Sequence, residues 1–138
     1  MKRFSVLPVA LLTAALLPAA VSAMAPHAPV AKLRTAQFGP VLVTSKKQAL
    51  YFWTREKRAG GKIRCIGACA KLWPPLIVKS RRIDPRVAGI GGRFATVRRP
   101  DGRFQVTYNG LGVYTYVHEG PRQVKCNNVN GWFVVRLH

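Results

Sequence analysis

The chain has 138 residues, of which 23 are Lys or Arg and four are Asp or Glu, and its formal net charge is +19. This length suits one domain with a modest core. A small domain with so much positive charge attracts polyanions, although a solvated basic surface that only keeps the protein in solution has the same composition.

The N-terminal segment, residues 1–23, has the three parts of a secretory signal peptide. Lys2 and Arg3 form a basic start, residues 4–17 are apolar, and Val21-Ser22-Ala23 supplies small residues for cleavage. The apolar run is shorter than the roughly 20 residues that a transmembrane helix needs. No cysteine stands at the cleavage site to accept a lipid. We therefore expect a periplasmic or extracellular protein, cleaved near Ala23 and not lipid-anchored.

Cleavage would remove Lys2 and Arg3 and lower the formal net charge from +19 to +17. Such a charge favours binding to the polyanions of an envelope compartment, which are lipid headgroups, lipopolysaccharide, teichoic acid and extracellular DNA. Anionic envelope or extracellular polymers are the partners that the composition predicts.

Residues 24–38 are rich in Ala and Pro and predict a flexible lead-in. Residues 39–138 predict a single domain of short β-type runs separated by turn residues, with at most one turn of helix near residues 67–72. The fold class is therefore all-β. The predicted strands cover residues 41–45, 49–55, 93–98, 103–108, 112–118 and 132–137.

Two sequence signals predict hairpin turns inside this domain. Pro100-Asp101-Gly102 combines a fixed φ at proline with a glycine that accepts positive φ. Asn109-Gly110 is the strongest short-range hairpin signal. Residues 79–92, which contain four basic side chains and Pro85, predict a surface loop.

The domain also contains an internal repeat, found by sliding the chain on itself by 63 residues. Two β-hairpin units, at about 39–78 and 100–138, would pack around a pseudo-twofold core as a small sandwich or barrel-like sheet, because neither can bury its apolar face alone. A four-residue deletion would also align Trp73 with Trp132. The other aligned pairs are Gly39 with Gly102, Val43-Thr44 with Val106-Thr107, Tyr51 with Tyr114, Trp53 with Tyr116, and Glu56 with Glu119.

These motifs resemble one bacterial family, the predicted secreted lipoproteins with the Yx(FWY)xxD motif, also described as a secreted repeat of unknown function. The resemblance rests on the two Tyr-x-aromatic-x-x-acid segments, on Cys65-Ile66-Gly67-Ala68-Cys69 with the following Trp73-Pro74-Pro75, and on residues 101–110. It covers roughly residues 38–137. It implies an extracytoplasmic β-domain, often near the membrane, with no assigned reaction and no catalytic residues to transfer.

The chain departs from the family pattern at three points. The acid of each motif is Glu rather than Asp, at Glu56 and Glu119; the lipid-acceptor cysteine is missing; and Cys126 is an additional thiol.

The motif aromatics Tyr51, Trp53, Tyr114 and Tyr116 form two i, i+2 pairs, each on one strand face, which favours a role in the core. Alternatively, aromatics beside arginines form a stacking platform for nucleic acid or sugars.

The motif acids Glu56 and Glu119 follow the predicted strands, where a carboxylate accepts hydrogen bonds from turn amides or pairs with a nearby arginine. A paired acid and base for glycoside hydrolysis is the enzymatic alternative. Neighbouring cations such as Arg55 lower the pKa of a carboxyl group and favour an ion pair instead. We therefore expect a protein that is not an enzyme.

In an oxidising compartment cysteines tend to pair, so that three cysteines leave one without a partner in the chain. A bond from Cys65 or Cys69 to Cys126 closes a long loop and contributes about 4 kcal/mol, whereas a Cys65–Cys69 bond contributes only about 2 kcal/mol. Loop entropy thus favours the long bridge. The resemblance implies the short bridge, Cys65–Cys69, with Cys126 free or competing for it.

The alternative function uses the same cysteines. Cys65, Cys69 and His118 together would suit Cu(I), and the two cysteines alone would suit thiol–disulfide exchange. No zinc or haem pattern is present. The principal expectation is a non-enzymatic exported protein without a cofactor.

Overall fold

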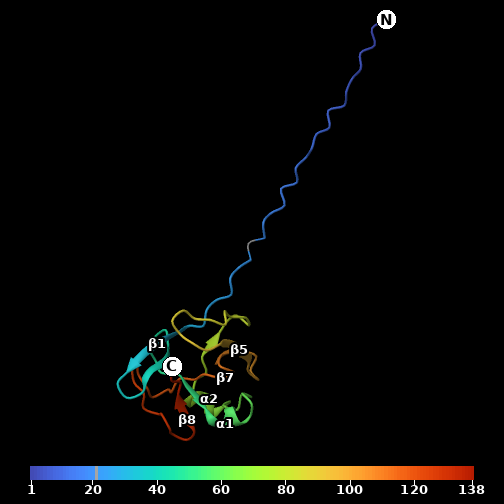
Figure 1. Cartoon of the computed structure of the whole chain (residues 1–138). Coiled ribbons are helices and arrows are strands. Elements are labelled where there is room, and N and C mark those ends of the chain that lie inside the picture. Colours follow the sequence, from blue (N-terminus) through green and yellow to red (C-terminus); the bar gives the residue numbers. More distant parts are fainter. Residues whose placement is uncertain (21) are drawn as a thin grey trace.

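The computed structural model describes residues 1–20 and 22–138, and Figure 1 shows a folded domain with a long N-terminal extension. Residues 1–20 and 22–27 are exposed and contain no helix or strand. Val21, part of the predicted cleavage motif, lies outside the described residues. In the part of the chain that is described, no helix has the length and apolar character to cross a membrane.

The described residues form ten short elements, and the predicted all-β class is confirmed. The strands pair antiparallel in three small sheets, β1 with β2, β3 with β8, and β4, β5 and β7 around β6, without a closed barrel among these residues. The elements are β1 (Val30–Thr35), β2 (Gly39–Thr44), β3 (Tyr51–Trp53), α1 (Thr54–Arg58), α2 (Ala68–Leu72), β4 (Ile77–Val78), β5 (Phe94–Arg98), β6 (Phe104–Tyr108), β7 (Leu111–Gly112) and β8 (Trp132–Val134).

Both predicted turns are confirmed. Asn109 and Gly110 have φ values of 48° and 84° and connect β6 to β7 in a two-residue hairpin. Gly102 has a φ of 86° in the turn between β5 and β6. The predicted helical turn near residues 67–72 is α2.

Three sequence expectations are wrong. The strand predicted at 112–118 is reduced to Gly112 at the end of β7 and isolated bridges at Tyr114. Residues 30–35 of the predicted flexible lead-in form β1, because Ala31 and Leu33 pack against the core while Lys32 and Arg34 stay exposed. This alternation is a strand pattern. The predicted strand at 49–55 ends at Trp53, where α1 begins, so that Glu56 lies on a helical turn.

The strand pairings give two equivalent hairpins, in a register that differs from the ungapped sequence alignment. Lys32 pairs with Leu42 in the first repeat, and Thr96 pairs with Val106 in the second, so these strands are related by 64 residues. Tyr51 and Tyr114 are still related by 63. The first repeat has one extra residue in the turn that follows β2, and the repeats begin at β1 and β5 rather than at residues 39 and 100.

Tyr51 and Tyr114 lie opposite each other at the centre of the domain. The backbone N–H of each donates to the carbonyl of the other, at 2.8 and 2.9 Å. Both side chains are fully buried in one apolar cluster, which also contains Trp73 and Trp132. The two repeats therefore meet at equivalent residues.

Candidate functional site

Each motif tyrosine hydrogen-bonds the glutamate of the other repeat. The Tyr51 hydroxyl lies 2.8 and 2.7 Å from the two carboxylate oxygens of Glu119. The Tyr114 hydroxyl lies 2.9 and 2.7 Å from those of Glu56. All four side chains are buried. The sequence alignment placed each tyrosine beside the glutamate of its own repeat and gave no sign of this exchange.

The two glutamates also accept hydrogen bonds from backbone amides. Glu56 accepts from the N–H groups of Arg64 and Cys65 at 2.6 and 3.0 Å, and Glu119 accepts from that of Lys125 at 3.0 Å. Each carboxylate thus fixes the loop that follows its motif.

Of the two partners expected for the motif glutamates, the turn amides are found, and the alternative, an ion pair with an arginine, is not found in the described part of the chain. Neither Glu56 nor Glu119 forms a salt bridge with any described residue, because both side chains point into the core. Burial raises the pKa of Glu119, although the Tyr51 and Lys125 hydrogen bonds act in the opposite direction. Burial, reinforced by the neighbouring carboxylate, likewise raises the pKa of Tyr51 and of Tyr114.

The two glutamates are poorly accessible to a substrate for acid–base chemistry. Glu56 is 1% exposed and Glu119 is 6% exposed. A substrate in solvent cannot reach either carboxylate without opening the core, and each already has a hydroxyl and at least one backbone amide as partners.

Four aromatic rings pack in a continuous row, the aromatic stack, across the twofold centre; the first three are stacked and the fourth is tilted by 38°. Their order is Trp53, Trp132, Trp73 and Tyr116, with centroid distances of 5.1, 4.0 and 4.7 Å along the stack. Since Trp53 corresponds to Tyr116 and Trp73 to Trp132, the stack reads the same from either end. The rings pack on one another, and only the half-buried end residues approach solvent.

Cys65 and Cys69 form a disulfide with a Cα–Cα distance of 5.1 Å, so the short bridge is confirmed and the long one is wrong. Cys126 is free and buried. Its backbone N–H lies 3.3 Å from the Tyr51 hydroxyl. Because Cys65 likewise follows Glu56 and approaches its carboxylate, Cys126 occupies in the second repeat the place of Cys65 in the first.

The set proposed for Cu(I) is not assembled in the structure. The disulfide consumes the thiols of Cys65 and Cys69, and His118 is exposed beside Tyr116. Among the described residues, no three His, Cys, Asp or Glu side chains are grouped so that they could hold a metal ion.

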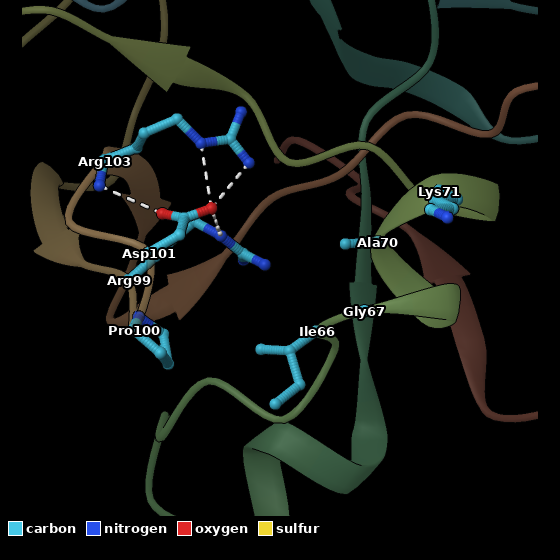
Figure 2. Close-up of a pocket in the computed structure, with 8 residues that line it drawn as sticks. All are labelled: Ile66, Gly67, Ala70, Lys71, Arg99, Pro100, Asp101 and Arg103. Carbon is cyan, nitrogen blue, oxygen red and sulfur yellow. Dashed lines mark hydrogen bonds and ion pairs between the residues drawn. The ribbon is translucent and has the colours of Figure 1, made fainter.

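A basic hollow of about 280 Å³ lies between the disulfide loop and the turn that joins β5 to β6 (Figure 2). Sequence reasoning missed this site. The residues from the disulfide loop and α2 form one side of the hollow, and those from the β5–β6 turn form the other (Figure 2). Its lining is Ile66, Gly67, Ala70, Lys71, Arg99, Pro100, Asp101 and Arg103.

The charged groups of this hollow form a small network. The Asp101 carboxylate accepts from the Arg103 Nε and Nη2 at 2.9 and 2.8 Å. These bonds lower the pKa of Asp101. Arg99, which is 3% exposed, lies next to this pair, with its Nε 3.9 Å from an Asp101 carboxylate oxygen. Comparison of the two repeats could have identified this network. Its three charged residues in the β5–β6 turn correspond to uncharged residues in the first repeat, which are Thr35, Gln37 and Gly39.

Comparison with known proteins gives one match. Residues 32–77 match the sequence model of a family described as a secreted repeat of unknown function. No curated protein and no solved structure matches the chain. The matched segment begins in β1 and ends in β4, and so coincides with the first structural repeat. Over this repeat, the chain is similar to a family of secreted proteins whose role is not assigned.

Proposed function

We propose that this protein is an exported, non-enzymatic domain whose basic surface binds anionic polymers of the cell envelope or the extracellular space. The observation that carries the proposal is the burial of acidic rather than basic side chains. Glu56 and Glu119, half of the four acidic residues, are withdrawn into the core by their tyrosine partners.

The ratio of basic to acidic residues is therefore higher on the surface than in the whole sequence. Of the 23 basic residues, Lys2 and Arg3 lie in the predicted signal peptide and Arg99 is buried, which leaves twenty on the domain surface. Only Asp84 and Asp101 remain to oppose them. A surface with this excess of positive charge draws in polyanions.

Several surface cations are also held close together. Arg81, Arg82 and Arg93 line one hollow of about 360 Å³ beside β5. Elsewhere, the Arg55 guanidinium carbon lies 5.5 Å from the centroid of the Trp53 ring. Cations grouped in this way raise the local positive potential.

Binding of the purified protein to poly(glycerol phosphate) and to polyglutamate, measured across a series of salt concentrations, tests the proposal. We expect both polymers to bind at low salt, with an affinity that falls steeply as salt rises because counterions are released. The proposal would be overturned if neither polymer bound at low salt.

Neutralisation of one cluster supplies an internal check. The double variant Arg81→Gln and Arg82→Gln should bind both polymers more weakly, and each lost contact should reduce the salt slope by roughly one. An unchanged slope would exclude this cluster from the binding surface.

A further inference from the structure

We propose that the hollow between the disulfide loop and the β5–β6 turn binds a phosphomonoester group. This inference rests on the proposed function, since it names one chemical group that the basic surface would recognise at a defined place. Its lining residues are those drawn in Figure 2.

The first argument is the buried charge of Arg99. Its Nη1 donates to the Gln105 side-chain oxygen at 2.7 Å, and its Nη2 donates to the Cys65 carbonyl at 2.7 Å. Its Nε has no hydrogen-bond partner, and the nearest carboxylate oxygen, of Asp101, is 3.9 Å away. The guanidinium thus hydrogen-bonds only neutral groups, and its ion pair with Asp101 is long and shared with Arg103, so that its buried charge is only partly compensated.

The second argument is the charge balance of the hollow. Asp101 is the only carboxylate in its lining, and Arg103 already binds that carboxylate with two side-chain hydrogen bonds. Lys71 and Arg99 add two further positive charges, so the lining carries an excess of two. A phosphomonoester carries about −1.5 to −2 at neutral pH and matches this excess better than a carboxylate does.

The third argument comes from the other repeat. The equivalents of Arg99, Asp101 and Arg103 in the β1–β2 turn are uncharged. Asn130, two residues before Trp132, takes the place of Lys71, two residues before Trp73. The hairpin of the first repeat thus forms without any of the four charges, so they are a feature of the second repeat and not of the shared hairpin.

The disulfide holds one wall of the hollow. Ile66 and Gly67 lie inside the Cys65–Cys69 loop, and Ala70 and Lys71 follow it directly. Arg99 is in turn fixed by the Cys65 carbonyl. Reduction of the bond should release this wall and weaken binding, while the rest of the basic surface is unaffected.

Titration of the isotopically labelled protein with glycerol 1-phosphate, followed by NMR, tests the site. We expect amide shifts confined to the disulfide loop and the β5–β6 turn, and weaker binding of dimethyl phosphate, which carries one charge less. Lys71→Gln should weaken glycerol 1-phosphate binding by about tenfold through loss of a charged contact.

Two further variants separate this site from general electrostatics. Arg81→Gln with Arg82→Gln removes two surface charges elsewhere and should leave glycerol 1-phosphate binding unchanged. Asp101→Asn should tighten binding, since it removes the competing carboxylate but keeps an oxygen to accept the Arg103 N–H. Equal weakening by Lys71→Gln and by the Arg81/Arg82 pair would overturn the proposal, as would no binding at all.

Binding of poly(glycerol phosphate) with and without its terminal phosphate shows whether the phosphomonoester in the hollow comes from a polymer end or from a small molecule. Weaker binding after removal of that phosphate places the polymer end in the hollow, and unchanged polymer binding beside tight glycerol 1-phosphate binding assigns the site to small phosphate esters. Polymer binding without any glycerol 1-phosphate shifts refutes the hollow alone. Glycerol 1-phosphate shifts without polymer binding refute the proposed function alone.

Discussion

The Tyr51 hydroxyl donates a hydrogen bond to the carboxylate of Glu119, which lies 68 residues later in the chain. Tyr114 makes the same contact with Glu56, 58 residues earlier. Each repeat therefore supplies the partner that the other repeat needs for its buried polar group. A buried carboxylate without such a partner costs about 1–3 kcal/mol or more.

A double-mutant cycle checks this exchange. Tyr51→Phe and Glu119→Gln should each destabilise the protein by about 1–3 kcal/mol, and their effects should be coupled by at least about 0.5 kcal/mol. Tyr51→Phe combined with Glu56→Gln provides the matched control and should be closer to additive. Urea unfolding gives the four free energies, and the reverse ranking of the two couplings would contradict the assignment.

The stability of the protein should depend on the protonation of Glu119. Because burial raises its pKa above the ordinary 4.5, the folded state holds this proton more tightly than the unfolded state does. Its stabilising contribution is therefore fully present below about pH 4.5 and is lost as the pH rises through the raised pKa. The unfolding free energy of the wild type minus that of Glu119→Gln should fall between pH 4 and pH 7. A difference that grows with pH would contradict this sign.

The cysteines should differ in reactivity. Cys126 is 8% exposed, and burial raises the pKa of its thiol. The native protein should therefore react very slowly with a thiol reagent, and the denatured, non-reduced protein should show one thiol, which Cys126→Ala removes. Fast reaction of the native protein, or three thiols on denaturation, would contradict this state of the cysteines.

The aromatic stack should be most sensitive at its centre. Trp132 is 3% exposed and stacks on both Trp53 and Trp73, so Trp132→Ala should cost about 3–5 kcal/mol. Trp53 is only half-buried and ends the stack, so Trp53→Ala should cost clearly less. Thermal unfolding followed by circular dichroism compares the two, and equal losses would show that the stack is not centred on Trp132.

Local sequence signals predicted the turns, the β-class and the existence of a repeat. The hairpin at Asn109-Gly110 is encoded by two adjacent residues, and the pairing of Tyr51 with Tyr114 follows from their equal places in the two units. The Cys65–Cys69 bond came from the family resemblance, since loop entropy favoured a different pairing.

What the sequence did not predict depends on three-dimensional register. One residue more in the turn after β2 shifts the alignment of the first strands, and an ungapped comparison conceals this shift. For the same reason, the comparison did not reveal that β1 corresponds to β5. The exchange of tyrosines and glutamates, and the burial of Arg99 beside Gln105, arise from contacts between segments that no linear pattern brings together.

The reciprocal tyrosine–glutamate contacts have a consequence for how such a chain can arise. A polypeptide with one repeat alone has a tyrosine and a glutamate whose partners lie on another copy of itself. It would complete its core only as a symmetric homodimer, in which each subunit's hydroxyl reaches its neighbour's carboxylate. Gene duplication and fusion would convert that dimer into a monomer without moving any contact. Either half could then diverge alone, and the charged turn at Arg99 and Asp101 differs in this way from its uncharged counterpart in the first repeat.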